Sequence, residues 1–495
     1  MKIKFLSTPI YYANDRPHVG HLYSTVLVDI WKKACALQNV KSFFLTGMDE
    51  HGQKVAQSAQ ARGYSPKEYV DHLSEEFVNF FHHCDIKYDY WIRTTDEAHE
   101  KAVQHFWGQL EKNGYIYKGA YAGWYSISDE AYLSEAEAKE VDTSNPKYVW
   151  QEEECYYFKL SAFEEKLKKF YQDNPDRIYP VERYNETVGF LKQGLKDFVI
   201  SRPKERLYWG IEVPSDPEHV IYVWIDALVN YLSAIGYPDE QYKNYWPGMH
   251  VLGKDILKFH AIYWPALLMA ANIELPAKMY IHGWWLRDDA KISKSSGNAF
   301  SLDELFQKYK VDGLRYFLIR GVEMGSDGNF REDLVKSVVE SELSNKFGNL
   351  FLRILGILDL SFMNVLPASE TYEEESIVKK IEEFYAMFTK LPQDPSLICA
   401  YAKKFIDCVT MLNSFFDEKQ IWNMQDKNEK ASVLYFLLDM FRKIAILIYP
   451  IMPDVSRKIL NCFEFNVSLA NYDKPIAREF GGNKPVFFPK YNPNA

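Results

Sequence analysis

Two histidines near the start of the chain form the first group of side chains with a clear chemical use. His18 and His21 lie three residues apart in the run HVGH, at the expected start of a helix, so both imidazoles lie on one face. Gly20 between them lets a purine ring approach the backbone, and the helix N-terminus adds partial positive charge. Two surface histidines would be the simplest interpretation of this run alone, but the preceding run TPIYYAN favours nucleotide binding.

Two lysines in the run KISKS at residues 291–295 form the second group. Lys291 and Lys294 lie in an expected loop that closes with Ser295 and further small residues. Such a loop can bring ammonium groups to a departing phosphate and then withdraw them. A solvated basic turn is the commoner origin of a K-x-x-K run. A strand is expected directly before the KISKS run, and the run follows HVGH in the chain. Both observations favour a role in nucleotide chemistry.

The elements that must position these runs alternate between strands and helices. We expect strands at residues 3–7 and 41–45, with a helix that begins near residue 18 between them. This β-α-β pattern predicts a Rossmann-type α/β domain with a parallel sheet that binds ligands at the carboxyl ends of its strands. The alternation resumes later with expected strands at residues 220–224, 249–252 and 279–282.

Two stretches depart from this alternation. After residue 115 the chain carries short Tyr- and Trp-rich runs with acidic clusters, which indicate an inserted subdomain. From about residue 341, apolar residues recur at three-and-four spacing, which predicts an all-α helical bundle. The predicted segments are 1–115 (Rossmann domain, first half), 116–215 (insertion), 216–275 (Rossmann domain, second half), 276–338 (KISKS region) and 339–495 (helical domain).

The composition is typical of a globular protein with several domains. The chain has 495 residues, of which 47% are hydrophobic and 25% charged. A formal net charge of −10 argues against a general nucleic-acid coat, although local basic patches can still neutralise phosphates. The 6 cysteines include no C-x-x-C pair, which indicates reduced thiols and a cytoplasmic location. The sequence suggests neither a signal peptide nor a membrane span.

These runs, in this order, resemble the class I aminoacyl-tRNA synthetases, whose HIGH and KMSKS motifs correspond to HVGH and KISKS. Ile292 replaces the usual methionine with another apolar residue of medium size. Three further runs resemble the methionyl-tRNA synthetases in particular: STPIYYAN, YVWIDAL, and GKDI followed by His260 and Trp264. The resemblance covers roughly residues 5–460. It implies an enzyme that activates methionine with ATP and transfers it to tRNA(Met), including the initiator tRNA.

The resemblance implies a methionine site with aromatic walls. A thioether gains sulfur–aromatic contacts on the order of 1 kcal/mol, so such walls suit it. Asp49 would hold the substrate ammonium, because a buried cation needs a partnered anion. The methionine side chain would be surrounded by Ile10, Tyr12, Trp224, Ala227, Leu228, Tyr231, Ile256, His260 and Trp264.

The resemblance also implies an ATP site. His18, His21, Lys291 and Lys294 would be the catalytic residues, and Mg²⁺ would accompany ATP. Arg202 would lie near the adenylate and the tRNA end. ATP would contact His18, Gly20, His21, Gly253, Asp255, His282, Gly283, Lys291, Lys294 and Ser295.

The insertion and the helical domain carry the remaining predictions. Ser126 and Asp129 stand where zinc-bearing relatives have a C-x-x-C pair, and this pair makes a poor zinc site, so we expect no zinc. In the helical domain, Asn349 and Arg353 lie one turn apart, and Trp422 resembles the family's anticodon-stacking tryptophan. An unpaired base needs such a ring and edge-directed donors, so the resemblance implies an anticodon site here.

Two alternatives stay open on the sequence alone. One is another class I synthetase, although the insertion is short for the editing enzymes of isoleucine, valine or leucine. The other is an inactive, RNA-binding paralogue, although the retained His18, His21, Asp49 and Lys294 favour catalysis. The chain ends soon after the helical domain, so we expect a monomer without an appended domain.

Overall fold

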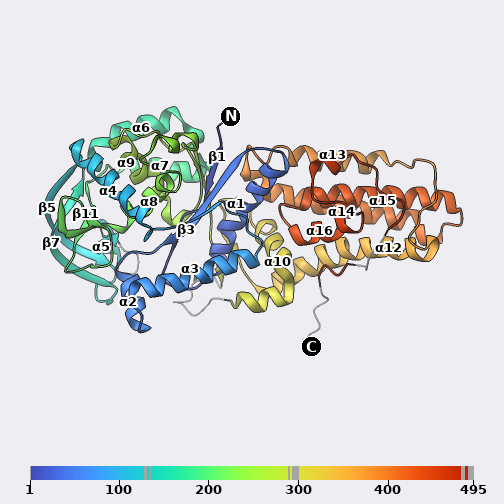
Figure 1. The fold of residues 1–495 in the computed structure, drawn as a ribbon, viewed down its shortest axis with the longest axis horizontal. Helices are drawn as coiled ribbons and strands as arrows, with labels where there is room; N and C mark the ends of the chain where they lie inside the picture. The colour runs from blue at the N-terminus through green and yellow to red at the C-terminus, as the bar shows by residue number, and fades with distance from the viewer. Residues whose placement is uncertain are drawn as a thin grey trace. The chain divides into compact units, whose positions relative to one another are not determined.

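The computed structural model describes residues 2–127, 131–133, 135–287, 290–291, 300–480 and 485–488, with the backbone alone at 131–132, 135–137 and 290–291. The chain folds as two compact units (Figure 1). The first comprises Met1–Pro17, Ser42–His82 and Tyr88–Gly283, and the second comprises His18–Lys41, His83–Lys87 and Trp284–Ala495. The helix that follows HVGH therefore belongs to the second unit, whereas the strands before and after it belong to the first. The five predicted segments stay predictions.

A parallel sheet forms the centre of the first unit, as the β-α-β pattern predicts. Its strands follow the order β2-β3-β1-β13-β14-β8, and β4 pairs with β3. Leu6, Phe44 and Leu252 on its central strands are fully buried, which is typical of a parallel sheet covered on both faces. The strands are β1 (Lys4–Ser7), β2 (Tyr11–Tyr12), β3 (Ser42–Asp49), β4 (Tyr90–Arg93), β8 (Ile178–Tyr179), β13 (Met249–Gly253) and β14 (Lys278–His282).

Two elements of this unit differ from the prediction in ways that matter for the site. Strand β3 continues to Asp49, because its later residues pair in parallel with β4. The expected strand at 220–224 was wrong beyond Ile221: β12 (Asp216–Ile221) joins a separate antiparallel sheet with β10 (Ser201–Pro203) and β11 (Glu212–Val213). Helix α8 (Val223–Ser233) then begins at once, since a short apolar run is equally compatible with a strand or a buried helix.

One continuous apolar core lies between the parallel sheet and its helices. Trp107 of α4, Leu228 of α8 and Trp264 of α9 all belong to it, together with Leu252 of the sheet. The α-helices of this unit besides α8 are α2 (Gln53–Ala61), α3 (Pro66–His83), α4 (Glu97–Lys112), α5 (Glu135–Glu140), α6 (Glu164–Asp173), α7 (Val181–Lys192) and α9 (Trp264–Ala270).

The predicted insertion contains a long antiparallel ribbon. Strands β5 (Ile116–Ser126) and β7 (Tyr148–Phe158) pair along their whole length. Their sheet has the order β6-β5-β7-β9, with the short edge strands β6 (Ala131–Tyr132) and β9 (Phe198–Val199). Aromatic pairs cross the ribbon, such as Trp124 against Trp150 with ring centroids 5.6 Å apart. Such cross-strand pairs stabilise a sheet. Ser126 is buried, and Asp129 lies outside the described residues.

The second unit is mostly helical. The helices α13, α14 and α15 lie side by side (Figure 1). Phe347, Phe351 and Phe441 are fully buried, as the three-and-four spacing predicts. None of the described helices is long and apolar enough to cross a membrane. The main helices are α1 (Val19–Leu37), α10 (Leu302–Arg320), α11 (Glu332–Val338), α12 (Asn349–Phe362), α13 (Glu375–Phe388), α14 (Ile398–Lys419), α15 (Lys427–Ile448) and α16 (Pro453–Asn461).

A buried ion pair joins α1 to α10 within this unit. The Arg315 guanidinium donates to the Asp29 carboxylate at 2.6 Å, and both side chains are fully buried. Arg315 also donates to the backbone carbonyls of Pro450 and Ile451, at 2.8 and 2.9 Å. Lys33 donates to the same carboxylate. The helix that starts at HVGH is thereby tied to the end of the long helix α15.

Candidate active site

The carboxyl ends of neighbouring parallel strands bring several predicted residues to one edge of the sheet. Tyr12 and Asp49 are register partners at the ends of β2 and β3. Gly253 and His282 are register partners at the ends of β13 and β14. This edge is where open α/β sheets bind their ligands.

Four aromatic side chains, which we call the aromatic site, lie on α8, on the turn before α9 and at the start of α9: Trp224, Tyr231, His260 and Trp264. The Tyr231 ring lies 5.7 Å from that of His260 and 6.2 Å from that of Trp264, between centroids. Trp224 is partly exposed and meets the edge of His260 at 6.3 Å. A π-helical turn, Phe259–Tyr263, carries His260, and such turns are frequent at functional sites.

Four further residues predicted for methionine lie on α8 or pack in or against the apolar core of this unit. Leu228 belongs to the same apolar cluster as Tyr231 and Trp264, and the partly buried Ile10 and Ile256 pack against that cluster. Ala227 lies on α8, 6% exposed. Of the predicted set, Trp224, Ala227, Leu228 and Tyr231 share α8, and Tyr12 and Asp49 lie at strand ends of the same unit.

Hydrogen bonds settle where the protons lie in the aromatic site. His260 Nδ1 lies 2.9 Å from the carbonyl oxygen of Ile256, which can only accept, so Nδ1 carries the proton. Burial lowers the pKa of His260 to about 4, so the imidazole is neutral near pH 7 and its Nε2 accepts. The Tyr231 hydroxyl therefore donates to that Nε2 at 2.9 Å. Neither of the two side chains has a proton left to donate to a thioether.

Gly253, Asp255 and His282 form a group at the ends of β13 and β14. A Cβ at Gly253 would lie 2.6 Å from Asp255 Oδ1 and 3.6 Å from His282 Cε1, so a side chain here would displace the Asp255 carboxylate. Asp255 is exposed, whereas His282 is buried and its Nδ1 donates to the carbonyl of Gly283 at 2.7 Å. An exposed carboxylate beside a bare backbone is suited to bind sugar hydroxyls.

His18 and His21 form the cap of α1 in the second unit, on one face as predicted. The backbone N–H of Gly20 donates to His18 Nδ1 at 3.1 Å, and the backbone N–H of His18 donates to His21 Nδ1 at 3.2 Å. Their rings stack with centroids 3.8 Å apart. Because both Nδ1 atoms accept, both rings carry their proton on Nε2, as donors to an anion need. A Cβ at Gly20 would lie 2.9 Å from His18 Cε1, so a side chain there would crowd the His18 ring.

The structure describes the KISKS run in part. The backbone of Lys291 forms the short strand β16 (Ala290–Lys291), antiparallel to β15 (Trp285–Arg287). Lys294 and Ser295 lie outside the described residues.

Arg202 is 1% exposed, and this burial was not apparent from the sequence. Its guanidinium donates to Gln53 and Gln151 at 2.9 and 2.5 Å and lies 4.1 Å from the Tyr125 ring centroid. Glu153 lies 3.7 Å from Arg202 Nε. In this structure Arg202 joins the β5–β7 ribbon to the start of α2, and its predicted role toward the adenylate stays a prediction.

The predicted anticodon residues include a stacked group in the second unit. The Arg353 guanidinium lies 4.5 Å from the Phe416 ring centroid and 5.4 Å from that of Trp422. Trp422 is 43% exposed, and Asn349 is exposed one turn before Arg353 on α12. An exposed indole beside a guanidinium suits an unpaired base.

Three buried residues that sequence reasoning did not single out meet beside the methionine residues. Asp226 accepts hydrogen bonds from His51 Nδ1 and His99 Nε2, both at 2.7 Å. Burial by itself would lower the pKa of His51, but the Asp226 carboxylate raises that pKa above its ordinary value. Asp226 was visible inside YVWIDAL and His51 soon after Asp49, but no local spacing connects the two. His99 lies on α4 and had no signal at all.

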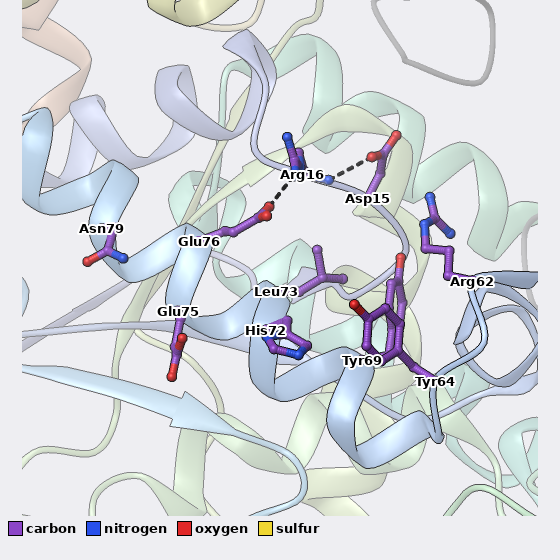
Figure 2. A pocket seen from close by; sticks show the side chains of 10 residues that line it. All are labelled: Asp15, Arg16, Arg62, Tyr64, Tyr69, His72, Leu73, Glu75, Glu76 and Asn79. Carbon is purple, nitrogen blue, oxygen red and sulfur yellow. Dashed lines mark hydrogen bonds and ion pairs between the residues drawn. The ribbon is translucent and has the colours of Figure 1, made fainter. Parts of the chain in front are cut away.

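A separate polar hollow of about 430 Å³ opens beside α3 (Figure 2). Arg16 pairs with Glu76 at 3.0 Å on one side, and Arg62 lies over the Tyr69 ring on another. It contains none of the predicted site residues. Its lining consists of Asp15, Arg16, Arg62, Tyr64, Tyr69, His72, Leu73, Glu75, Glu76 and Asn79.

Within the described residues, no three His, Cys, Asp or Glu side chains are grouped to hold a metal ion. The expectation of a zinc-free insertion stays a prediction, because Asp129 is not among those residues.

Comparison with known proteins decides the family. The family model for "tRNA synthetases class I (M)" matches residues 4–147 and 138–355. A methionine–tRNA ligase of Rickettsia conorii is 40% identical over 509 aligned residues, covering 98% of this chain and 99% of the relative. The chain belongs to the methionine–tRNA ligase family of class I aminoacyl-tRNA synthetases.

Other members of this family extend the similarity. The methionine–tRNA ligase of Caldanaerobacter subterraneus is 40% identical over 95% of this chain and 75% of the relative. A solved structure of Mycobacterium tuberculosis methionyl-tRNA synthetase in complex with methionyl-adenylate superposes with a TM-score of 0.92 at 34% identity, covering 98% of this chain and 99% of that one. The Rossmann-type fold and the helical C-terminal region predicted from the sequence are those of the family.

Proposed function

We propose that this chain is a methionine–tRNA ligase that converts L-methionine and ATP to methionyl-adenylate and transfers the methionyl group to tRNA(Met). The main support is the structural similarity, over nearly the whole chain, to a methionyl-tRNA synthetase in complex with methionyl-adenylate. The aromatic site supports this choice among class I enzymes, because its apolar, polarisable rings suit a thioether.

The amino-acid site divides into two parts. Asp49, 8% exposed at the end of β3, binds the substrate ammonium. Trp224, Tyr231, His260 and Trp264 contact the thioether side chain. His260 must be neutral here, because an imidazolium would have to be desolvated beside the uncharged methionine side chain.

The ATP site combines donors and one acceptor. His18 and His21 donate from Nε2 to phosphate oxygens at the N-terminus of α1, and Lys291 and Lys294 neutralise charge on the departing pyrophosphate, with Mg²⁺ bound to ATP. Asp255 accepts from ribose hydroxyls. These groups stabilise the pentavalent phosphorus formed when the methionine carboxylate attacks the α-phosphate. No bond to the enzyme forms, and the terminal ribose hydroxyl of tRNA then attacks the adenylate carbonyl.

The tRNA is recognised by the second unit. Trp422 stacks on an anticodon base, while Arg353 and Asn349 donate to base edges. Recognition of the initiator tRNA, a monomeric state, an insertion without zinc and a cytoplasmic location complete the proposal.

Amino-acid-dependent ATP–pyrophosphate exchange, without tRNA and across all twenty amino acids, tests the proposed function. We expect exchange with methionine alone, and no stoichiometric zinc in the same sample. Asp49→Asn is expected to raise the KM for methionine strongly, and Lys294→Ala to lower the exchange rate with little change in methionine affinity. Exchange with a different amino acid would refute the substrate assignment, and an unchanged rate for Lys294→Ala would remove the KISKS run from the mechanism.

A further inference from the structure

A buried carboxylate lies between two histidines behind the amino-acid site. Asp226 is 1% exposed, and its two oxygens accept from His51 and His99 at 2.7 Å each. His51 and His99 are 4% and 1% exposed. His99 is held in turn by Ser233 Oγ, 2.7 Å from its Nδ1. Each oxygen of a fully buried carboxylate thus has a fixed partner, one from α4 and one from the segment after β3.

His51 connects this carboxylate to the residue that binds the ammonium. It lies two residues after Asp49, where β3 has ended and α2 has not yet begun. The backbone of the same segment is held by Trp209, whose Nε1 donates to the Glu50 carbonyl at 2.6 Å. The hydrogen bond from His51 to Asp226 is the side-chain tie of this segment toward α8.

Helix α8 does not depend on Asp226 for its own position. Ile225, Leu228 and Val229 are almost completely buried in the apolar core of the first unit. Such packing keeps the helix in place when one polar contact is removed. Asp49 is the last residue of β3, and the short segment between it and α2, which carries His51, lies outside regular structure and loses its side-chain contact with α8.

We propose that Asp226 is a positioning residue for the substrate ammonium: through His51 it holds the segment that directly follows Asp49, and so the direction of the Asp49 carboxylate at the end of β3. Asp226 itself does not touch the substrate. The inference rests on the proposed function, because it takes Asp49 as the partner of the ammonium.

Two ligands distinguish a positioning role from a general structural one. Methionine carries the ammonium, and 4-(methylsulfanyl)butanoate is the same molecule without it. The dissociation constants of both are measured by isothermal titration on the full chain without ATP or tRNA. The wild-type chain is expected to prefer methionine, because Asp49 pairs with the ammonium. Asp226→Asn is expected to weaken methionine binding about tenfold and to leave the analogue unchanged.

Asp216→Asn is the matched control. Asp216 makes a carboxylate–imidazole contact of the same kind, at 3.0 Å to His219, on β12 in the same unit. We expect this variant to keep the wild-type preference. His51→Leu should lose the preference as Asp226→Asn does, and His51→Gln, which keeps a donor, should retain most of it. If Asp226→Asn does not fold, the two His51 variants decide the question.

Three results overturn the inference. Equal weakening of both ligands in Asp226→Asn would make the residue a general structural element. An unchanged preference in that variant, or in His51→Leu, would show that the segment needs no such tie. A wild-type chain that binds methionine without preferring it to the analogue would refute the role of Asp49, and with it both the proposed site and this inference. If the wild-type chain prefers methionine and Asp226→Asn keeps the same preference, the inference is refuted while the proposed function stands.

Discussion

Replacing Tyr231 with phenylalanine removes one hydroxyl and leaves the aromatic site otherwise filled. That hydroxyl donates to His260 Nε2 at 2.9 Å, and the two side chains are 1% and 2% exposed, so no water replaces it. A buried acceptor left without a donor costs about 1–3 kcal/mol. Small single domains have a total free energy of unfolding of about 5–15 kcal/mol, so the loss is measurable. We expect Tyr231→Phe to lower the free energy of unfolding by that amount in urea, with an unchanged dependence on urea concentration.

The same change should affect methionine. With Nε2 released, His260 is held by its Nδ1 bond to Ile256 alone, and its ring can rotate away from the ligand. We expect the KM for methionine in pyrophosphate exchange to rise about fivefold, which corresponds to about 1 kcal/mol, with the KM for ATP unchanged.

Tyr171→Phe is the control for this prediction. Its hydroxyl is equally buried and donates to the carbonyl of Ala261 at 2.5 Å, but it is not part of the aromatic site. It should lose a similar amount of stability and keep the wild-type KM for methionine. Wild-type stability in Tyr231→Phe would refute the reasoning, because it would show that the buried hydrogen bond does not stabilise the fold. An equal rise of the KM for methionine in Tyr171→Phe would also refute it, because the effect on methionine would then be a general one.

Three further predictions concern other parts of the molecule. Arg315→Met should lower the free energy of unfolding by about 3–5 kcal/mol because it leaves the Asp29 carboxylate buried beside one cation fewer, and the double variant with Asp29→Leu should recover much of this in the same urea titration. As the pH falls from ~6.5 to 4, His260 takes up a proton in the unfolded chain but not in the folded chain, where its pKa is about 4. The free energy of unfolding should therefore fall over this range by on the order of 3 kcal/mol, and it should fall less steeply in His260→Asn. Parallel pH profiles of the two proteins would place the imidazole in contact with water. Trp422→Ala should raise the KM for tRNA in aminoacylation and leave pyrophosphate exchange intact, whereas Arg353→Lys, which keeps the charge but not the planar group, should have a smaller effect; equal loss in both assays would make Trp422 a packing residue.

The sequence by itself determined the nucleotide motifs and the type of fold. HVGH is a local feature: a helix cap, a glycine and two imidazoles within one turn follow from adjacent residues. The β-α-β pattern and the three-and-four spacing of the helical region are local as well, and both appear in the structure as predicted. The strand predicted at residues 220–224 failed for the same local reason, because a short apolar run does not distinguish a strand from a buried helix.

The tertiary structure decided everything that joins residues distant in the chain. Burial keeps His260 neutral, and its Nε2 accepts from Tyr231 of another helix, which no spacing reveals. The contact of Asp226 with His51 and His99 brings together the start of one helix, the segment after a strand and a second helix. Burial and hydrogen bonding across the core set these charges, since both depend on which surfaces the fold brings into contact and excludes from water.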